Sequence, residues 1–163
     1  MLEIIAENPA LHAEAIEDLF HRTFGPGHFA KTAERLREYS ASIPEINRVA
    51  VLDGKVIAVC RVWPLRVGQD RQRALFYGPV AVGPSHRGSR LGMTVTGEAL
   101  EAGQAAGWPA AILIGAPNYF REIGFRSAPK GQLTFPGPQD PSRILVRDLA
   151  GKADELSGLV EAA

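Results

Sequence analysis

The segment Val80–Gly92, VAVGPSHRGSRLG, predicts a strand, a turn, a basic loop and the start of a helix in direct succession. Two arginines, Arg87 and Arg90, flank Gly88 in the loop. Backbone N–H groups at a helix N-terminus have no intrahelical partner and carry a partial positive charge, so they favour bound phosphate. The segment therefore predicts a site for a phosphorylated cofactor where a strand meets a helix.

The rest of the chain alternates strand and helix patterns, which indicates a mixed α/β sheet. Strands are predicted at Leu2–Ala6, Asn47–Leu52, Val56–Val62 (extending toward Val67), Arg73–Val82, Ala110–Gly115, Phe125–Arg126 and Arg143–Leu149. Helices are predicted from Pro9 to near Gly25, at Ala30–Tyr39, at Arg90–Ala106 and at Asn118–Ile123. The Pro- and Gly-rich stretch Pro129–Pro141 is expected to be a surface loop, and no element is assigned to the small, mostly polar tail Ala150–Ala163.

Glycine and proline mark three irregular places in these strands. Asp53-Gly54 is typical of a tight hairpin turn, and Pro64 marks an edge or a bend. Gly78-Pro79 interrupts a strand, and since proline cannot donate to a ladder, we expect a bulge there. Beyond this bulge, the backbone N–H groups of Val80–Val82 are expected to lack a partner in a neighbouring strand.

Size and composition limit the class of protein. A chain of 163 residues with 45% hydrophobic and 22% charged residues fits one globular domain, residues 1–163. The formal net charge of zero gives no reason to expect a nucleic-acid or membrane partner. The acidic, amphipathic N-terminus does not resemble a signal peptide and no apolar run is long enough to span a membrane, so a cytoplasmic enzyme or binding protein is expected.

Neither cysteine nor histidine predicts a metal site. The single cysteine, Cys60, lies within a predicted strand, where it is expected to be a small buried hydrophobic residue. His12 and His21 lie on the first predicted helix without a second ligand at metal-binding spacing. We therefore expect no metal.

Two motifs in this order resemble the GCN5-related N-acetyltransferase (GNAT) family. The loop Arg87–Gly92, RGSRLG, is similar to the family pattern Gln/Arg-x-x-Gly-x-Gly/Ala at its first and last positions, with Arg90 in place of the central glycine. The stretch Gly115–Phe125, GAPNYFREIGF, looks like the family segment G-x-P-x-Y-Y-x-x-x-G-F. The resemblance runs from the first strand to Arg147, and the LGP-x-AV-like run Tyr77–Val82 with the ending DPSRILVRDL points to a small bacterial subgroup of predicted acetyltransferases.

The resemblance implies both a fold and a co-substrate. The GNAT fold is an α/β fold with a mixed, mostly antiparallel central sheet, splayed strands four and five, and helices on both faces. The co-substrate is acetyl-CoA, whose pantetheine arm enters the gap between the splayed strands. The residues implied in its binding are Val80, Ala81, Val82, Arg87, Gly88, Ser89, Arg90, Leu91, Gly92, Asn118 and Phe120. Arg87 and Arg90 are alternatively solvated loop charges, and Ser89 either donates to phosphate or caps the following helix.

The implied reaction is acetyl transfer to a primary amine, which must be neutral when it attacks the thioester. The family uses a tyrosine as the acid for the thiolate, but Phe120 stands at that position and Tyr119 precedes it, rotated by about 100° on a helix. Tyr119 is therefore either the acid or a residue that packs against pantetheine or in the core. The base is unassigned, since Arg73–Val82 has no carboxylate; Glu122 and His28 are candidates.

The acceptor is expected to be an amine of a small molecule or a peptide, lined by Phe24–Phe29 and by residues near Lys130–Pro141. A second hypothesis is a GNAT-fold protein that binds or senses acyl-CoA with little or no turnover. A different nucleotide-binding α/β domain is disfavoured, because the chain has no complete P-loop or dinucleotide-binding glycine pattern. The family resemblance also makes a homodimer an expectation.

Overall fold

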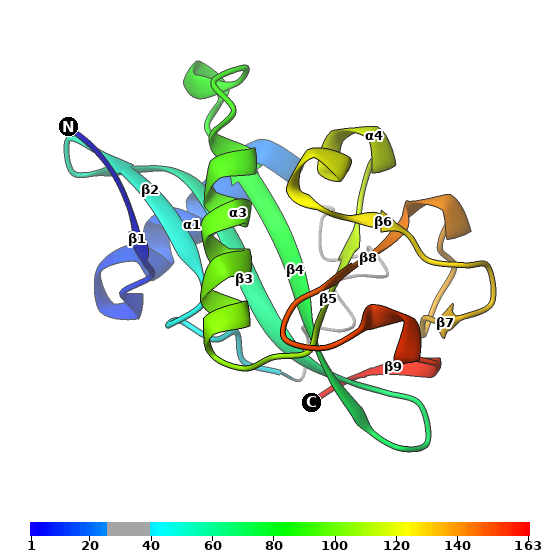
Figure 1. The fold of residues 1–163 in the computed structure, drawn as a ribbon. Coiled ribbons are helices and arrows are strands. Elements are labelled where there is room, and N and C mark those ends of the chain that lie inside the picture. The colour runs from blue at the N-terminus through cyan, green and yellow to red at the C-terminus, as the bar shows by residue number, and fades with distance from the viewer. Residues whose placement is uncertain (26–39) are drawn as a thin grey trace.

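The computed structural model describes residues 1–25 and 40–163, and it forms a twisted sheet with helices packed against it (Figure 1). The strands are β1 (Leu2–Ala6), β2 (Arg48–Leu52), β3 (Lys55–Val67), β4 (Gln72–Val82), β5 (Ala110–Ile114), β6 (Arg126–Ser127), β7 (Leu133–Thr134), β8 (Ile144–Asp148) and β9 (Gly158–Ala162). The α-helices are α1 (Pro9–Phe24), α3 (Leu91–Ala105) and α4 (Pro117–Phe120). Short 3-10 helices cover Pro84–His86, Arg121–Ile123, Pro141–Arg143 and Ala153–Glu155.

The main strands lie in the order β1-β2-β3-β4-β5-β8-β6, and β1 to β4 are antiparallel neighbours. The β2–β3 hairpin turns at Asp53 and Gly54, which both have positive φ, as a tight hairpin turn requires. The β3–β4 register shifts between Cys60 and Val62. One extra residue of β4 is accommodated there, opposite Gly78-Pro79, so the predicted bulge is confirmed.

β4 and β5 are parallel neighbours that meet only at one end. Their paired residues are Leu75 with Ala111 and Phe76 with Ile112. Beyond Phe76, β4 continues to Val82 with β3 as its only paired strand among the described residues. The two strands therefore splay, and this opening positions the site.

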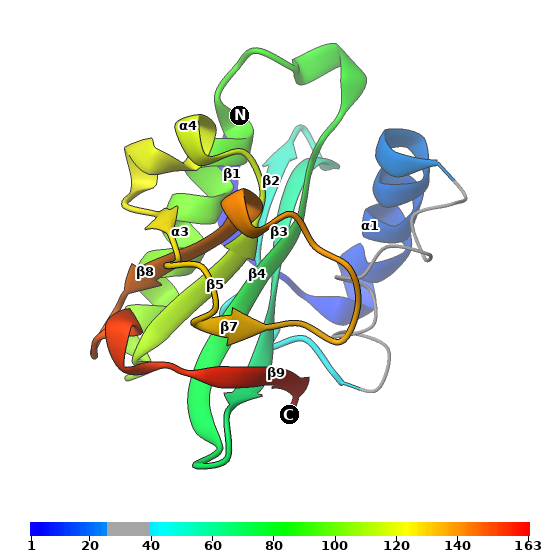
Figure 2. The same ribbon diagram turned by 90° about the vertical axis from the view of Figure 1, so that its right-hand side faces the viewer.

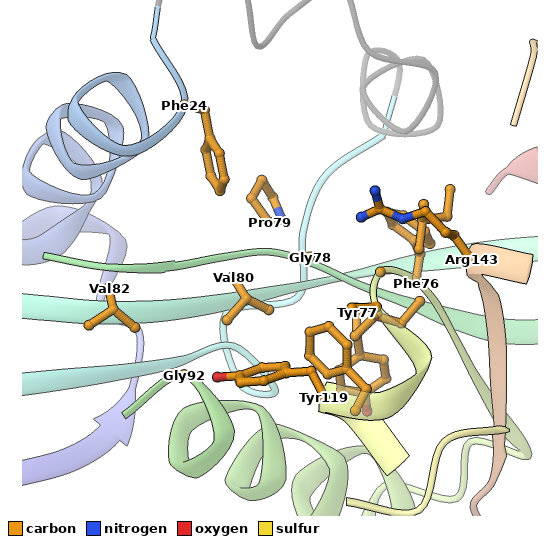
Figure 3. A pocket seen from close by; sticks show the side chains of 15 residues that line it. Phe24, Phe76, Tyr77, Gly78, Pro79, Val80, Val82, Gly92, Tyr119 and Arg143 are labelled. Atoms are coloured by element: carbon orange, nitrogen blue, oxygen red, sulfur yellow. The ribbon is translucent and has the colours of Figure 1, made fainter. Parts of the chain in front are cut away.

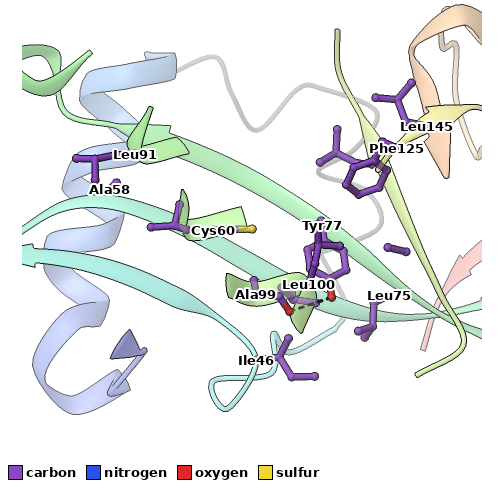
Figure 4. Packing of buried hydrophobic residues seen from close by; sticks show 14 of the residues in the cluster. Ile46, Ala58, Cys60, Leu75, Tyr77, Leu91, Ala99, Leu100, Phe125 and Leu145 are labelled. Carbon is purple, nitrogen blue, oxygen red and sulfur yellow. Dashed lines mark hydrogen bonds between the residues drawn. The ribbon is translucent and has the colours of Figure 1, made fainter. Parts of the chain in front are cut away.

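Helices cover both faces of the sheet, with α1 on one side and α3 on the other (Figure 2). On the α1 face, Ile16, Leu19 and Phe20 of the helix pack with buried valines of β2 and β3. On the α3 face, a larger cluster includes Leu100, Cys60 and Tyr77 (Figure 4). The predicted fold class is confirmed: a mixed, mostly antiparallel sheet with splayed strands four and five, and helices on both faces.

The predicted burial of Cys60 is also confirmed. Its side chain is completely buried, and this burial raises the pKa of the thiol to about 12. Tyr77 lies in the same cluster, and its hydroxyl donates to the carbonyl of Ala99 at 3.2 Å (Figure 4). Both polar atoms therefore belong to the core, and the thiol stays protonated and unreactive.

Two expectations for the C-terminal part are wrong. The stretch Pro129–Pro141 contains the strand β7, and the tail from Ala150 contains β9, which pairs with β3 and β7. The residues of β9 do not show the apolar alternation of a half-buried strand, because Val160 alone is fully buried while its neighbours are exposed or intermediate. The edge position expected for Pro64 is confirmed, since it lies within β3 between the residues paired with β2 and those paired with β9.

The predicted helix Ala30–Tyr39 lies outside the described residues. The helix predicted near Arg90 begins instead at Leu91, with Arg90 as its N-cap residue. The described helices are all too short or too polar to cross a membrane.

Candidate active site

The splayed strands open a central cavity of about 410 Å³ between β4 and β5. The lining from β4 runs from Phe76 to Val80 and includes Val82, while β5 contributes Leu113 and Ile114. Phe24 lines it from α1, and Gly92, Tyr119 and Phe120 line it from the α3 and α4 side (Figure 3). The walls are mostly apolar, so the cavity suits an extended apolar or amide-containing chain.

Backbone N–H groups of β4 face this opening. Gly83 donates its N–H to the carbonyl of Ile57 on β3 at 2.8 Å. Because N–H groups alternate between the two edges of an antiparallel strand, those of Val80 and Val82 point away from β3. No described strand pairs with β4 on that side at these residues. The two N–H groups are therefore available to a carbonyl oxygen in the gap.

The segment after β5 places an aromatic pair beside the cavity. Gly115 follows the strand, and a Cβ there would lie 2.6 Å from Cε2 of Phe120, so only glycine lets this ring pack closely. Phe120 also packs edge-on against Phe125, with ring centroids 6.2 Å apart. Phe120 thus anchors the short helix α4, and this leaves its neighbour Tyr119 partly exposed and directed along the cavity.

Tyr119 reaches the N-terminal turn of α3. A Cβ added to Gly92 would lie 3.1 Å from the Tyr119 hydroxyl and 3.4 Å from Cγ2 of Val82. These three residues line both the central cavity and a second one of about 220 Å³, the loop cavity, which His86–Gly88 and Arg90–Met93 border. The two cavities therefore meet at these residues to form one path, and a Cβ at Gly92 would crowd the junction.

The two loop arginines differ in their surroundings. Arg87 lines the loop cavity, and no ion pair to a described carboxylate holds its side chain. Arg90 has φ of +65°, the left-handed region for which the family pattern uses glycine, and its guanidinium pairs with the carboxylate of Glu122. That hydrogen bond raises the pKa of Arg90 further above its usual value. Arg87 is thus the freer of the two cations for phosphate.

Most of the sequence-predicted site residues lie along this path. Val80 and Phe120 line the central cavity, Arg87, Gly88, Arg90 and Leu91 line the loop cavity, and Val82, Gly92 and Tyr119 line both. Ala81, Ser89 and Asn118 line neither cavity. The Ala81 side chain is buried on the α1 face.

The helix-capping role suggested for Ser89 is wrong. Its hydroxyl donates to the carbonyl of His86, and the N-cap of α3 has no side-chain hydrogen bond. Of the two base candidates, Glu122 is paired with Arg90, and His28 lies outside the described residues.

Sequence reasoning missed Arg143 as a site residue. It ends the 3-10 helix Pro141–Arg143, and its carbonyl accepts the Gly115 N–H at 3.0 Å, so it is fixed to the rim of β5. Its side chain lines the central cavity (Figure 3). The predicted acceptor region ended at Pro141, two residues short of Arg143. The signal that could have identified Arg143 was a cation at the start of the last predicted strand.

The arrangement joins a cationic, glycine-containing loop at a helix N-terminus to an apolar channel beside backbone N–H groups that no described strand pairs with. Such a loop fits a pyrophosphate, and the channel fits a narrow chain that ends in a carbonyl. A phosphorylated thioester has this shape and polarity, so the described residues fit acetyl-CoA.

Comparison with known proteins agrees with this geometry. Residues 13–125, more than half of the chain, match the family model of the Acetyltransferase (GNAT) family. An N-acetyltransferase from Escherichia coli K12, YhbS, is 29% identical over 153 residues, which cover 93% of this chain and 90% of YhbS. The crystal structure of YhbS from Escherichia coli in complex with CoA matches with a TM-score of 0.83, over 99% of this chain and 89% of that one.

A more distant structure shows the fold alone. A GNAT family acetyltransferase from Brucella melitensis in complex with acetyl-CoA is 23% identical and has a TM-score of 0.60, over 92% of this chain and 97% of that chain. The matched region of the family model contains the loop, the splayed strands and the Gly124-Phe125 ending of the second motif. The chain therefore belongs to the GNAT acetyltransferase family.

Proposed function

We propose that this protein transfers the acetyl group of acetyl-CoA to a primary amine of a small molecule or peptide by direct attack. The observation that carries the proposal is the continuous path from the basic loop to the gap between β4 and β5, with Tyr119 beside it. The relatives bound to CoA and to acetyl-CoA support the choice of co-substrate.

Each part of the path has a role in this proposal. Arg87 and the N-terminal turn of α3 bind the pyrophosphate through charge and backbone N–H groups. The N–H groups of Val80 and Val82 donate to the acetyl oxygen as it becomes negatively charged during attack. The Tyr119 hydroxyl donates a proton to the departing thiolate.

The proton of the acceptor amine needs a separate route. An alkylamine has a pKa of about 10.4, so it arrives mostly protonated at neutral pH. The described residues that line the central cavity include no carboxylate and no histidine. We therefore assign proton removal to water in the open part of the cavity, which makes the rate increase with pH as the neutral amine becomes more abundant.

The test is release of free CoA from acetyl-CoA with a panel of amines, for the wild type and Tyr119→Phe. We expect Tyr119→Phe to lower kcat by about 100-fold, the lower range of general acid catalysis, with little change in the KM for acetyl-CoA. Calorimetry with CoA is the control for binding. Undiminished kcat would make Tyr119 a packing residue.

The lack of a base among the described lining residues favours one second candidate, an acyl-CoA-binding protein with little or no turnover. The same panel separates the two hypotheses. Tight CoA binding without CoA release on any amine supports the binding protein, whereas release that depends on an amine supports the transferase.

A further inference from the structure

Arg143 is the one charged side chain among the described residues that line the central cavity. Every other described lining residue is apolar, a glycine or a tyrosine. Arg143 is an exposed residue, so water screens its charge, and its contribution to binding depends on direct hydrogen bonds from the guanidinium group to an anion. Its position is therefore relevant to what the cavity binds.

The backbone of Arg143 is held by hydrogen bonds, whereas no carboxylate among the described residues forms an ion pair with its guanidinium group. The Asp140 carboxylate accepts the N–H of Ser142 at 3.0 Å and its hydroxyl at 2.8 Å, which caps the 3-10 helix. These bonds from Ser142, the hydroxyl first, lower the pKa of Asp140, and the charge of Arg143 adds to the effect. Asp140 is thus engaged with Ser142, and no ion pair joins Arg143 to a carboxylate among the described residues.

The location of Arg143 in the cavity differs from that of Tyr119. Tyr119 and Gly92 lie where the central cavity joins the loop cavity, on the cofactor path. Figure 3 shows the Arg143 guanidinium on the other side of β4, the side on which Phe24 and Pro79 also lie. Arg143 therefore faces the part of the cavity that the cofactor path leaves for a second substrate.

We propose that Arg143 binds an anionic group of the acceptor, so that the acceptor is an amine that also carries a carboxylate or a phosphate. The planar guanidinium matches either group with two parallel hydrogen bonds. The same charge opposes a purely cationic amine, and it favours the neutral, nucleophilic form of an amine held close by. This substrate class rests on the proposed acetyl transfer.

The turnover test uses matched acceptors that differ only in the anionic group. One pair is phenylalanine and phenethylamine, and the other is O-phosphoethanolamine and ethanolamine, so the two pairs distinguish carboxylate from phosphate. We expect wild-type kcat/KM to favour an anionic member by about 10- to 100-fold, mainly through KM. Arg143→Gln removes that preference, Arg143→Lys restores part of it, and Lys152→Gln, at an exposed cation outside the cavity, leaves it intact.

A binding test separates this inference from the proposed function. Calorimetry on the CoA-loaded protein compares N-acetylphenylalanine with N-phenethylacetamide, for the wild type and Arg143→Gln. Amine turnover with no anionic preference, or with equal losses for both members of a pair in Arg143→Gln, overturns the role of Arg143 and leaves acetyl transfer standing. Binding of the anionic amide that depends on Arg143, without turnover on any amine, upholds the anion site and refutes acetyl transfer.

Discussion

The two halves of β4 belong to one strand but have different neighbours. Around Leu75 and Phe76, β4 pairs with β3 on one edge and β5 on the other, and both side chains are buried. From Val80 to Val82, β4 pairs only with β3 among the described strands, and the side chains of these two valines line the cavity. Similar apolar residues thus stabilise the fold in the first half and border the proposed reaction centre in the second.

The largest effect should come from shortening a side chain in the first half. Leu75→Ala removes a fully buried side chain and should lower the free energy of unfolding by about 2–5 kcal/mol. Val80→Ala, in the partly exposed second half, should cost less than about 1.5 kcal/mol and should instead weaken CoA binding. Urea unfolding and calorimetry measure both quantities, and equal losses of stability would show that the two halves do not differ.

A second comparison uses two glycines of α3. A Cβ at Gly92 would narrow the path between Val82 and Tyr119, so Gly92→Ala should weaken CoA binding by about tenfold. At Gly97 the nearest heavy atom to an added Cβ is 4.0 Å away, so Gly97→Ala should leave CoA binding unchanged and stabilise the helix by up to about 1 kcal/mol. Calorimetry checks both variants, and an unchanged affinity in Gly92→Ala would mean that the cofactor does not pass there.

The loop arginines provide a smaller contrast beside the second half of β4. Arg87→Ala should weaken the binding of CoA and of dephospho-CoA similarly, by about three- to tenfold, because both ligands carry the pyrophosphate. Arg90→Gly should change CoA affinity little, since Glu122 already neutralises Arg90. The free energy of unfolding should also change little, because relief of the left-handed backbone offsets the lost surface ion pair. A loss of affinity in Arg90→Gly as large as that in Arg87→Ala would contradict this assignment.

Local sequence patterns predicted the elements around the site well. Asp53-Gly54 has few alternatives to a hairpin turn, and Gly78-Pro79 cannot continue a regular ladder, so residue chemistry alone determined both features. The continuous apolar run AAILI likewise predicted the buried strand β5. These features depend on neighbours in sequence, which explains why they were predictable.

Features that depend on distant residues were not predictable in this way. β9 forms because β3 has a free edge beyond Pro64, and nothing in the tail itself marks that edge. The pairing of Arg90 with Glu122 and the direction of Tyr119 both follow from the packing of α4 beside α3. Arg143 enters the cavity because β8 pairs with β5, so its role depends on topology that the order of residues does not state.

The smallest expected effect is on the stability of the fold, and it concerns the segment Ala153–Ser157, which is hydrogen-bonded to the first half of β4. Gln72, the first residue of β4, bonds to this segment: its side-chain amide donates to the Glu155 carbonyl at 2.9 Å and accepts the Ser157 N–H at 3.3 Å. The segment is held in turn by the Asp148 carboxylate, which accepts the Ala153 N–H at 2.7 Å. That bond is the main cause of the lowered pKa of Asp148.

The lowered pKa of Asp148 gives its contribution to the free energy of unfolding a defined pH dependence. A carboxyl group whose pKa is lower in the folded state stabilises the fold above its unfolded pKa of about 3.9, and this stabilisation is lost as the pH falls through the folded pKa. Asp148→Asn should therefore be less stable than the wild type at pH 7, and the gap in urea midpoints should narrow between pH 5 and pH 2. CoA affinity at pH 7 should be equal in the two proteins, because Asp148 lies outside both cavities. A difference in urea midpoints that stays constant with pH would mean that the Asp148 side chain acts through its shape rather than its charge. A loss of CoA affinity in Asp148→Asn would show that the two halves of β4 are coupled.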